Sequence, residues 1–249
     1  MTTLITGASS GIGAALATHF ATPDSHLILV ARRVERLQEV AALCQAKGAT
    51  VTLYSVDLSD LEATAQLGQT LTQHTIDRII LNAGISTGHH ALLTPIEQAV
   101  QLYNTNLLGV HALLVPLIPM LQAQKSGHIV FISSLASLYT MPSSLIYASS
   151  KRALNAYAQG LENMLLHDGI DVSMILPGFI QSELTAKNHF KMPFLLSLEA
   201  GSARIAHAIE RRRRFYAFPF RFVAIIFALR MLPFFLRGRL VRFANFNKA

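Results

Sequence analysis

The amino end of the chain places a short strand-like run, a glycine-rich turn and a helix-like run one after another. Residues 3–6 are β-branched or apolar, Gly7-Ala8-Ser9-Ser10-Gly11-Ile12-Gly13 is the turn, and AALATHFA follows. In a dinucleotide-binding βα unit the first glycine permits the tight turn, the second lets the backbone approach the pyrophosphate, and the third lets the helix pack closely. Free N–H groups and the dipole at the helix N-terminus favour phosphate. The spacing here is GxxxGxG, and a purely structural turn would look the same, so the rest of the chain must decide.

Strand-like and helix-like runs alternate along the rest of the chain. Further strands are predicted at residues 26–31, 50–56, 77–81, 127–134 and 170–176, and helices at residues 34–47, 61–73, 94–115 and 147–165. This alternation predicts an α/β fold with a mostly parallel, doubly wound sheet. Ligands bind such sheets beyond the carboxyl ends of the strands. We therefore expect the functional residues at those ends.

Two arginines follow the second predicted strand, where dinucleotide-binding units that take NAD usually carry an acid. Arg32 and Arg33 suit a 2′-phosphate, because guanidinium groups bind phosphate in a fork geometry. They favour NADP over NAD, although a solvated pair at a helix start is the alternative. Asp57 ends the third strand and is either an adenine contact or the N-cap of the following helix; the two roles are compatible.

A tyrosine and a lysine stand four residues apart in the helix predicted over residues 147–165. On a helix Tyr147 and Lys151 lie on the same face, and a nearby cation lowers the pKa of a phenol from about 10. A tyrosine tuned in this way exchanges protons near neutral pH. Ser134 ends the apolar run HIVFISS and offers a hydroxyl to a substrate oxygen. Such pairs are also common on ordinary helices, so the Tyr–Lys spacing alone indicates little.

Taken together, these motifs resemble those of the short-chain dehydrogenase/reductase family. TGASSGIG at residues 6–13, NAG at 82–84, Asn106 within NTNLLG, Ser134, Tyr147-x-x-x-Lys151 and Pro177-Gly178 occur in family order and spacing. The resemblance covers about residues 1–210. It implies a single-domain Rossmann-type fold with about seven strands, and hydride transfer between NAD(P) and an alcohol/carbonyl pair.

The resemblance also implies roles for individual residues. Tyr147 would be the general acid/base, and Lys151 would lower its pKa and hold the nicotinamide ribose. Ser134 would polarise the carbonyl, and Asn106 would support a water-mediated proton relay to Lys151. The remaining cofactor-binding residues would be Gly7, Ser9, Gly11 and Ile12 at the pyrophosphate, Asp57 and Asn82 near the adenine and its ribose, and Ser182 near the carboxamide, where the family usually has threonine.

The carboxyl end departs from the family pattern. Residues 1–203 carry 10 Lys and Arg against 13 Asp and Glu, a net charge of −3, whereas residues 204–249 carry 11 against 1, a net charge of +10. Residues 215–218 fit a last strand, and the apolar and aromatic residues that follow are interrupted by Arg230 and Pro233, which disfavours a membrane span. We therefore divide the chain into a catalytic domain, residues 1–210, and a basic, apolar extension, residues 211–249.

Three roles for this extension stay open. Basic and large apolar residues together suit a segment in the headgroup region of an anionic membrane, here residues 215–246. A subunit interface would cover the same surface, as would a flap over the substrate pocket. Nucleic acid is not expected as a partner, because phosphate binding does not need so many phenylalanines.

The sequence predicts an NADP(H)-dependent oxidoreductase that interconverts an alcohol and a ketone or aldehyde. An apolar run at residues 184–198, where the family keeps its substrate loop, favours a small hydrophobic or lipid-like substrate; core packing is the alternative. A non-catalytic NADP-binding regulatory or membrane-associated assembly protein is the rival function. No metal is expected, a homo-oligomer is, and the absence of a signal-like amino end predicts a cytoplasmic location, with the inner face of a membrane as an alternative.

Overall fold

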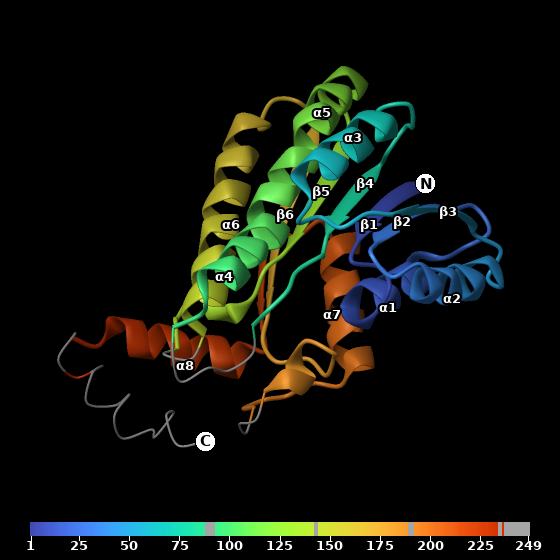
Figure 1. Cartoon of the computed structure of the whole chain (residues 1–249). Helices are drawn as coiled ribbons and strands as arrows, with labels where there is room; N and C mark the ends of the chain where they lie inside the picture. Colours follow the sequence, from blue (N-terminus) through green and yellow to red (C-terminus); the bar gives the residue numbers. More distant parts are fainter. Residues whose placement is uncertain (88–92, 142–143, 189–191, 234–235, 237–249) are drawn as a thin grey trace.

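The computed structural model describes residues 1–87, 93–141, 144–188, 192–233 and 236. Its centre is a parallel sheet of seven strands in the order β3-β2-β1-β4-β5-β6-β7 (Figure 1). The strands are β1 (Thr2–Thr6), β2 (His26–Ala31), β3 (Thr50–Ser55), β4 (Arg78–Leu81), β5 (Gly127–Ile132), β6 (Ile170–Pro177) and β7 (Phe215–Phe218). The predicted Rossmann-type α/β fold is confirmed, and so is the predicted last strand.

Helices cover both faces of this sheet. One face carries α1 (Gly11–Phe20), α2 (Val34–Gln45) and α7 (Leu198–Glu210), and the other carries α3 (Leu61–Leu71), α4 (Ile96–Tyr103), α5 (Gly109–Gln124) and α6 (Leu145–Met164) (Figure 1). Each face has its own apolar core, because central strands such as β5 are buried along their whole length and send alternate side chains to either side. The strand order reverses direction between β1 and β4, which opens the crevice where ligands of such folds bind.

The helix predicted over residues 94–115 differs most from the structure. It is three segments: α4, a π-helix over Asn104–Leu108 (η1), and α5, which continues to Gln124. The predicted end at residue 115 lies just before Pro116, and proline disfavours a helix interior. In the structure, buried leucines such as Leu113, Leu117 and Leu121 keep α5 on the sheet through Pro116 and Pro119.

One described helical run has the length and composition of a membrane span. It covers Ile96–Gln124, and many of its residues are buried inside the protein. Because α5 packs against α3 and the sheet, we assign this run to the core of the domain.

After β7 comes α8 (Phe220–Met231), which lies across the carboxyl edge of the sheet (Figure 1). Ile226 is its buried residue and packs with Leu135 and Leu176. Residues 237–249, which include Arg237, Arg239 and Arg242 of the predicted extension, lie outside the described residues.

Candidate active site

A cavity of about 850 Å³ opens at the carboxyl edge of the sheet. Its wall combines the turn between β1 and α1, the ends of β4, β5 and β6, the first turns of α6, and one side of α8. All predicted site residues except Asn106 line this cavity. The sequence predicts functional residues at the carboxyl ends of the strands, and in the structure these residues line one cavity.

In the glycine turn, the backbone at Gly13 packs closely against the backbone at Gly7. A Cβ on Gly13 would lie 2.2 Å from the Gly7 carbonyl oxygen, and Gly7 itself has a φ of +67°. The Asn82 amide nitrogen Nδ2 donates to the carbonyl oxygens of Thr6 (3.1 Å) and Gly7 (3.3 Å). Asn82 thus ties the end of β4 to the turn.

The start of α1 suits a phosphate group. Ser10 precedes the helix and makes no side-chain capping bond to it, so the first-turn N–H groups are left to other acceptors. Ser9, Gly11 and Ile12 line the cavity beside them. The turn, with no bulky side chain in the way, fits the pyrophosphate of a dinucleotide.

The two arginines line the cavity just after β2, each beside a carboxylate. Arg32 Nη1 lies 3.2 Å from Asp57 Oδ2. Arg33 Nη2 lies 2.8 Å from Glu183 Oε2 and donates to Ser10 Oγ at 2.7 Å. Glu183 was not among the predicted site residues, because its place after β6 gives no sign that it reaches the first βα turn.

Asp57 does not cap the following helix. Asp60 does so, accepting from the Ala63 N–H at 3.0 Å. Asp57 Oδ1 instead accepts from the backbone N–H and the hydroxyl of Ser59. Burial raises the pKa of Asp57, but the bonds from Ser59 and Arg32 outweigh it, and the net pKa is lowered. Asp57 therefore presents a charged carboxylate at the cavity wall.

Tyr147 lies in the first turns of α6, and Ser134 follows β5 at the start of a short 3₁₀ turn, Leu135–Ser137 (η2). Burial raises the pKa of Tyr147, and a hydrogen bond with the Ser134 side chain acts in the opposite direction. The expectation that Lys151 holds the Tyr147 pKa low is not met. Removal of the phenol from water outweighs the neighbouring groups.

Lys151 is buried, with 4% of its surface exposed. Its ammonium Nζ donates to the Ile132 carbonyl oxygen at 3.0 Å, and burial lowers its pKa to about 8. A buried ammonium beside a strand end is unusual, because charged lysines are rarely removed from water without a partner. The cavity opens next to it, and Lys151 is part of its wall.

Asn106 lies in the π-helix behind the cavity wall and is fully buried. Its Oδ1 accepts from the Ile85 N–H at 2.8 Å, and its Nδ2 donates to the Ile85 carbonyl oxygen and to Ser150 Oγ, both at 3.1 Å. Asn106 therefore fastens the strand end after β4 to helix α6. A Cβ on Gly84 would lie 3.2 Å from Lys151 Nζ and 3.3 Å from Asn106 Oδ1, so this glycine makes room for both.

A second set of bonds holds the turn that carries Ser134. Arg152 Nε donates to the Ser137 carbonyl oxygen (2.9 Å) and Nη2 to that of Leu138 (3.2 Å), while Asn155 Nδ2 donates to Ser137 Oγ (2.7 Å). Helix α6 thus carries Tyr147 and Lys151 and also anchors the turn of Ser134. Arg152 was missed by sequence reasoning, because its place beside Lys151 gives no hint of this contact.

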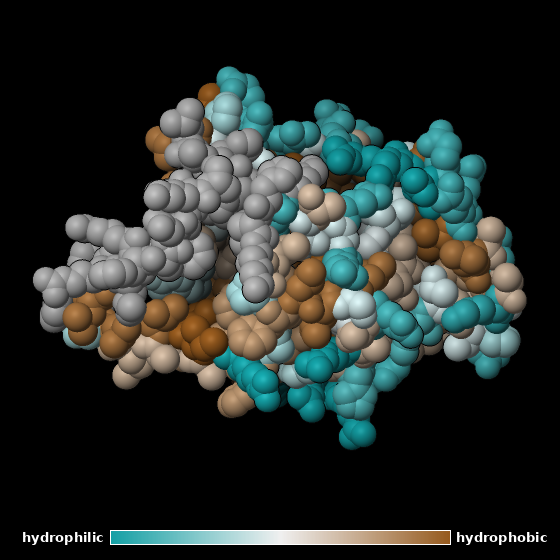
Figure 2. All heavy atoms as spheres, turned by 90° about the horizontal axis from the view of Figure 1, so that it is seen from below, coloured by the Kyte–Doolittle hydropathy of each residue, from teal (hydrophilic) through white to brown (hydrophobic). Residues whose placement is uncertain are grey.

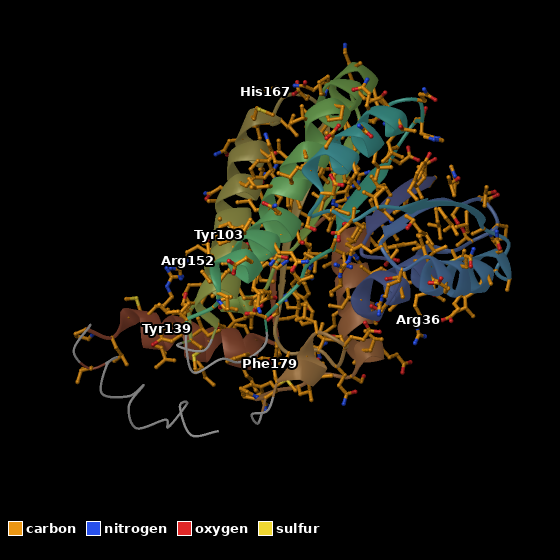
Figure 3. The ribbon with its side chains drawn as sticks, viewed as in Figure 1. Arg36, Tyr103, Tyr139, Arg152, His167 and Phe179 are labelled. Atoms are coloured by element: carbon orange, nitrogen blue, oxygen red, sulfur yellow. The ribbon has the colours of Figure 1, made fainter. Side chains whose placement is uncertain are left out.

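The other end of the cavity is apolar and aromatic. Phe222 of α8 stacks against Phe179 (5.9 Å between ring centroids) and lies against Phe194 (5.8 Å). In Figure 3, Tyr139 and Phe179 lie beside α8. The apolar lining here comprises Leu135, Tyr139, Met141, Phe179, Leu184, Pro193, Phe194, Phe222, Ile225, Ile226 and Leu229. Of the roles left open for the extension, a wall of the pocket is the one that α8 occupies in the structure.

Known proteins share this arrangement. A sequence model of the short chain dehydrogenase family matches residues 1–192. The chain belongs to the short-chain dehydrogenase/reductase family. It is 32% identical over 234 residues to an uncharacterized oxidoreductase of Myxococcus xanthus, covering 93% of this chain and 92% of the relative.

Two further likenesses within the short-chain family bear on chemistry. A fatty acyl-CoA reductase of Acinetobacter baylyi is 32% identical over 214 residues, covering 84% of this chain and 72% of that enzyme. A short-chain dehydrogenase from Sphingobium yanoikuyae, solved in complex with NADPH, superposes with a TM-score of 0.82 at 28% identity, covering 91% and 92% of the two chains. The chain is an NAD(P)-dependent dehydrogenase/reductase of this family, as its sequence predicts.

Proposed function

We propose that this short-chain dehydrogenase/reductase uses NADP(H) to interconvert a hydrophobic alcohol and its ketone or aldehyde. One observation carries the proposal: Tyr147, Ser134 and Lys151 share a single cavity with a phosphate-binding turn at one end and an apolar wall at the other. The assignments made from sequence to Asn106, Asp57, Asn82 and the turn residues belong to this proposal.

The polar side chains divide the work at the carbonyl oxygen. NADPH, when bound, supplies the hydride. As negative charge develops on the oxygen, Ser134 donates a hydrogen bond to it and Tyr147 donates a proton, both interactions being strongest in the transition state. Lys151 supplies a buried positive charge that favours the phenolate left on Tyr147. Asn106 acts through Ile85 and Ser150 by holding the wall in place.

The arginine pair supports a preference for NADP over NAD. Arg32 and Arg33 both line the adenosine end of the cavity, where a 2′-phosphate needs planar, bidentate donors. The Sphingobium yanoikuyae relative, which shares the fold over nine-tenths of the chain, was solved with NADPH. Ser182 also lines the cavity, and we assign its hydroxyl to the carboxamide.

The apolar wall supports a hydrophobic substrate. Pockets for such molecules are lined mainly by apolar and aromatic side chains with few polar groups to fix orientation. Here α8 and the segment around Phe179 and Phe194 supply that lining, opposite Ser134 and Tyr147. A lipid-like aldehyde or ketone fits this description, and the fatty acyl-CoA reductase of Acinetobacter baylyi is a relative whose name gives a substrate with a fatty chain.

The outer side of α8 supports contact with an anionic membrane surface. Phe220 is 80% and Met231 85% exposed, Phe227 is 46% exposed, and Arg221 and Arg230 are exposed on the same helix. Figure 2 shows apolar residues gathered on this face of the molecule. Large apolar side chains beside arginines suit the headgroup region of a bilayer. We accordingly place the protein in the cytoplasm at the inner face of a membrane, with a second subunit as the competing occupant of this surface.

The test replaces Tyr147 by Phe. With NADPH and a series of ketones and aldehydes of increasing apolar length, we expect the wild-type protein to turn over the longer members best. Tyr147→Phe removes the proton donor and is expected to lower kcat by at least about a thousandfold, while the dissociation constant of NADPH stays within about twofold.

Tyr103→Phe is the matched control. Tyr103 donates to Ser149 Oγ on the neighbouring helix and is not part of the cavity wall, so its loss is expected to leave kcat nearly unchanged. Full turnover by Tyr147→Phe would refute the assignment. A wild-type preference for small polar carbonyls would refute the proposed substrate class.

A further inference from the structure

Three side chains from distant parts of the chain meet at the adenosine end of the cavity. Glu183 Oε2 lies 2.8 Å from Arg33 Nη2, and Ser10 Oγ lies 3.2 Å from the same carboxylate oxygen and 2.7 Å from the same guanidinium nitrogen. Ser10 precedes α1, Arg33 follows β2, and Glu183 follows β6. All three line the cavity.

A guanidinium group and a hydroxyl that converge on one point form a site for an anion. Both donate hydrogen bonds to a carboxylate or a phosphate, and the bonds are strengthened by charge. The Arg33 bond lowers the pKa of Glu183 most, with smaller contributions from the Ser10 bond and the charge of Arg36, so Glu183 is a carboxylate at neutral pH. In the structure, the carboxylate of Glu183 occupies this position.

The same position is the one assigned above to the 2′-phosphate of NADP(H). Arg32, the other arginine of the pair after β2, is already paired with Asp57. A phosphate monoester carries a charge of about −1.5 to −2 near neutral pH. It competes for Arg33 with a single carboxylate in an exposed ion pair, and exposed pairs are only weakly stabilising. A phosphate at Arg33 therefore displaces Glu183 rather than joining it, because two anions on one guanidinium repel each other.

Glu183 also belongs to the segment that covers the glycine turn. A Cβ on Gly11 would lie 3.4 Å from Ser182 Cβ, and Ser182 and Leu184 on either side of Glu183 line the cavity. The carboxylate thus joins the segment after β6 to the first βα turn across the cofactor end of the site.

From these contacts we propose that Glu183 is a determinant of cofactor affinity that acts as an intramolecular competitor for the 2′-phosphate subsite. It holds Arg33 and Ser10 until the phosphate of NADP(H) replaces it. The inference rests on the proposed NADP(H) preference. A cofactor without the 2′-phosphate does not need Arg33, so its affinity is not set by this exchange.

The experiment measures the dissociation constants of NADPH and NADH by fluorescence titration for the wild-type chain, Glu183→Gln, Arg33→Gln and the double variant. Glutamine keeps the shape of the side chain and removes its charge. We expect Glu183→Gln to bind NADPH about three- to tenfold more tightly and NADH within about twofold of the wild type. In the Arg33→Gln background the same substitution is expected to change NADPH binding by less than about twofold, because the two side chains share one site.

Glu62→Gln is the matched control. Glu62 is an exposed carboxylate on α3 that accepts from Gln66 Nε2 and is not part of the cavity wall, so this variant measures the effect of removing one surface charge. Circular dichroism checks that each variant is folded.

The outcomes separate the two proposals. If Arg33→Gln does not weaken NADPH binding, the NADP(H) preference fails and this inference fails with it. If Arg33→Gln weakens NADPH binding but Glu183→Gln does not tighten it, the competitor role is overturned and the proposed function stands. The competitor role is also overturned if Glu183→Gln tightens NADPH and NADH binding equally, or if it tightens NADPH binding in the Arg33→Gln background as well. Glu183 would then act only as a general negative charge.

Discussion

At the scale of single residues, the space beside the Lys151 ammonium exists because residue 84 is a glycine. Gly84 follows β4, and a Cβ there would lie 3.2 Å from the Lys151 ammonium and 3.3 Å from the Asn106 amide oxygen. Both groups are held by hydrogen bonds, Lys151 Nζ to Ile132 and Asn106 to Ile85 and Ser150, so an added methyl group would have to displace one of them. The NAG motif of the sequence indicated that residue 84 matters but not that it abuts the proposed catalytic lysine.

Gly84→Ala tests this packing. We expect kcat to fall by about tenfold or more, because the added methyl group shifts Lys151 away from Tyr147, while NADPH binding changes little. Gly160→Ala is the matched control: a Cβ there meets nothing within 4 Å, and residue 160 lies inside α6. That change is expected to leave kcat unaltered and to raise stability by about 0.5–1 kcal/mol. An unchanged kcat for Gly84→Ala would show that the lysine does not depend on this contact.

The Tyr147–Lys151 pair shows the limit of residue-level prediction. The spacing of four residues correctly places both side chains at one cavity, because helical geometry is local. The pKa direction for Tyr147 is opposite to the expected one, because burial dominates it, and burial depends on which distant segments close over the helix. For the same reason Glu183 and Arg152, whose partners come from other elements, could not be found from the sequence.

At the scale of elements, predictions made from local patterns were the most accurate. β2 and β7 have the predicted bounds, because each is a short, mostly apolar run between polar or proline residues. The helix around Asn106 was mispredicted, because the π-helix and the two prolines of α5 are tolerated only through tertiary packing. The role of the extension that contains α8 was left open among three alternatives, because its apolar residues are not confined to one side of a helix and so do not reveal which side faces the protein.

The outer side of α8 gives a prediction at this scale. Phe220→Ser combined with Phe227→Ser and Met231→Ser is expected to lower binding to phosphatidylglycerol vesicles by at least about tenfold, since each apolar side chain buried in lipid contributes about 1.5–3 kcal/mol. Co-sedimentation at low and high salt measures it. High salt is expected to weaken wild-type binding, because part of the attraction comes from Arg221, Arg230 and the other basic residues of the extension.

A triple variant on other faces is the control for vesicle binding. Leu43, Met164 and Leu166 are each more than half exposed and lie on or next to α2 and α6, so their replacement by Ser is expected to leave binding unchanged. If the wild type ignores vesicles but forms dimers that the α8 substitutions dissociate, the surface is a subunit interface instead.

At the scale of the whole molecule, the buried ammonium of Lys151 links stability to pH. Burial lowers its pKa to about 8, whereas a lysine in an unfolded chain titrates near about 10.4. Between these pH values the unfolded state binds more protons than the folded state, so the free energy of unfolding rises with pH. Tyr147, whose pKa is raised, acts in the opposite direction only above about pH 10.

Lys151→Met removes this titration. From about pH 7 to about pH 9.5, we expect the free energy of unfolding of the wild-type chain to gain about 2 kcal/mol relative to that of Lys151→Met. Urea denaturation at a series of pH values provides the comparison. If the difference in free energy of unfolding between the wild type and Lys151→Met does not change over this pH range, the ammonium of Lys151 is not desolvated.

The path of the chain through the site has a consequence for biosynthesis. The proposed phosphate-binding turn lies between β1 and α1, whereas α8, which lines the apolar end, is synthesised after all seven strands of the sheet. In a nascent chain the phosphate-binding turn is therefore made long before the apolar wall of the cavity. A premature stop codon just after β7 is expected to leave a protein that still holds the cofactor but exposes the reactive end of the cavity to water.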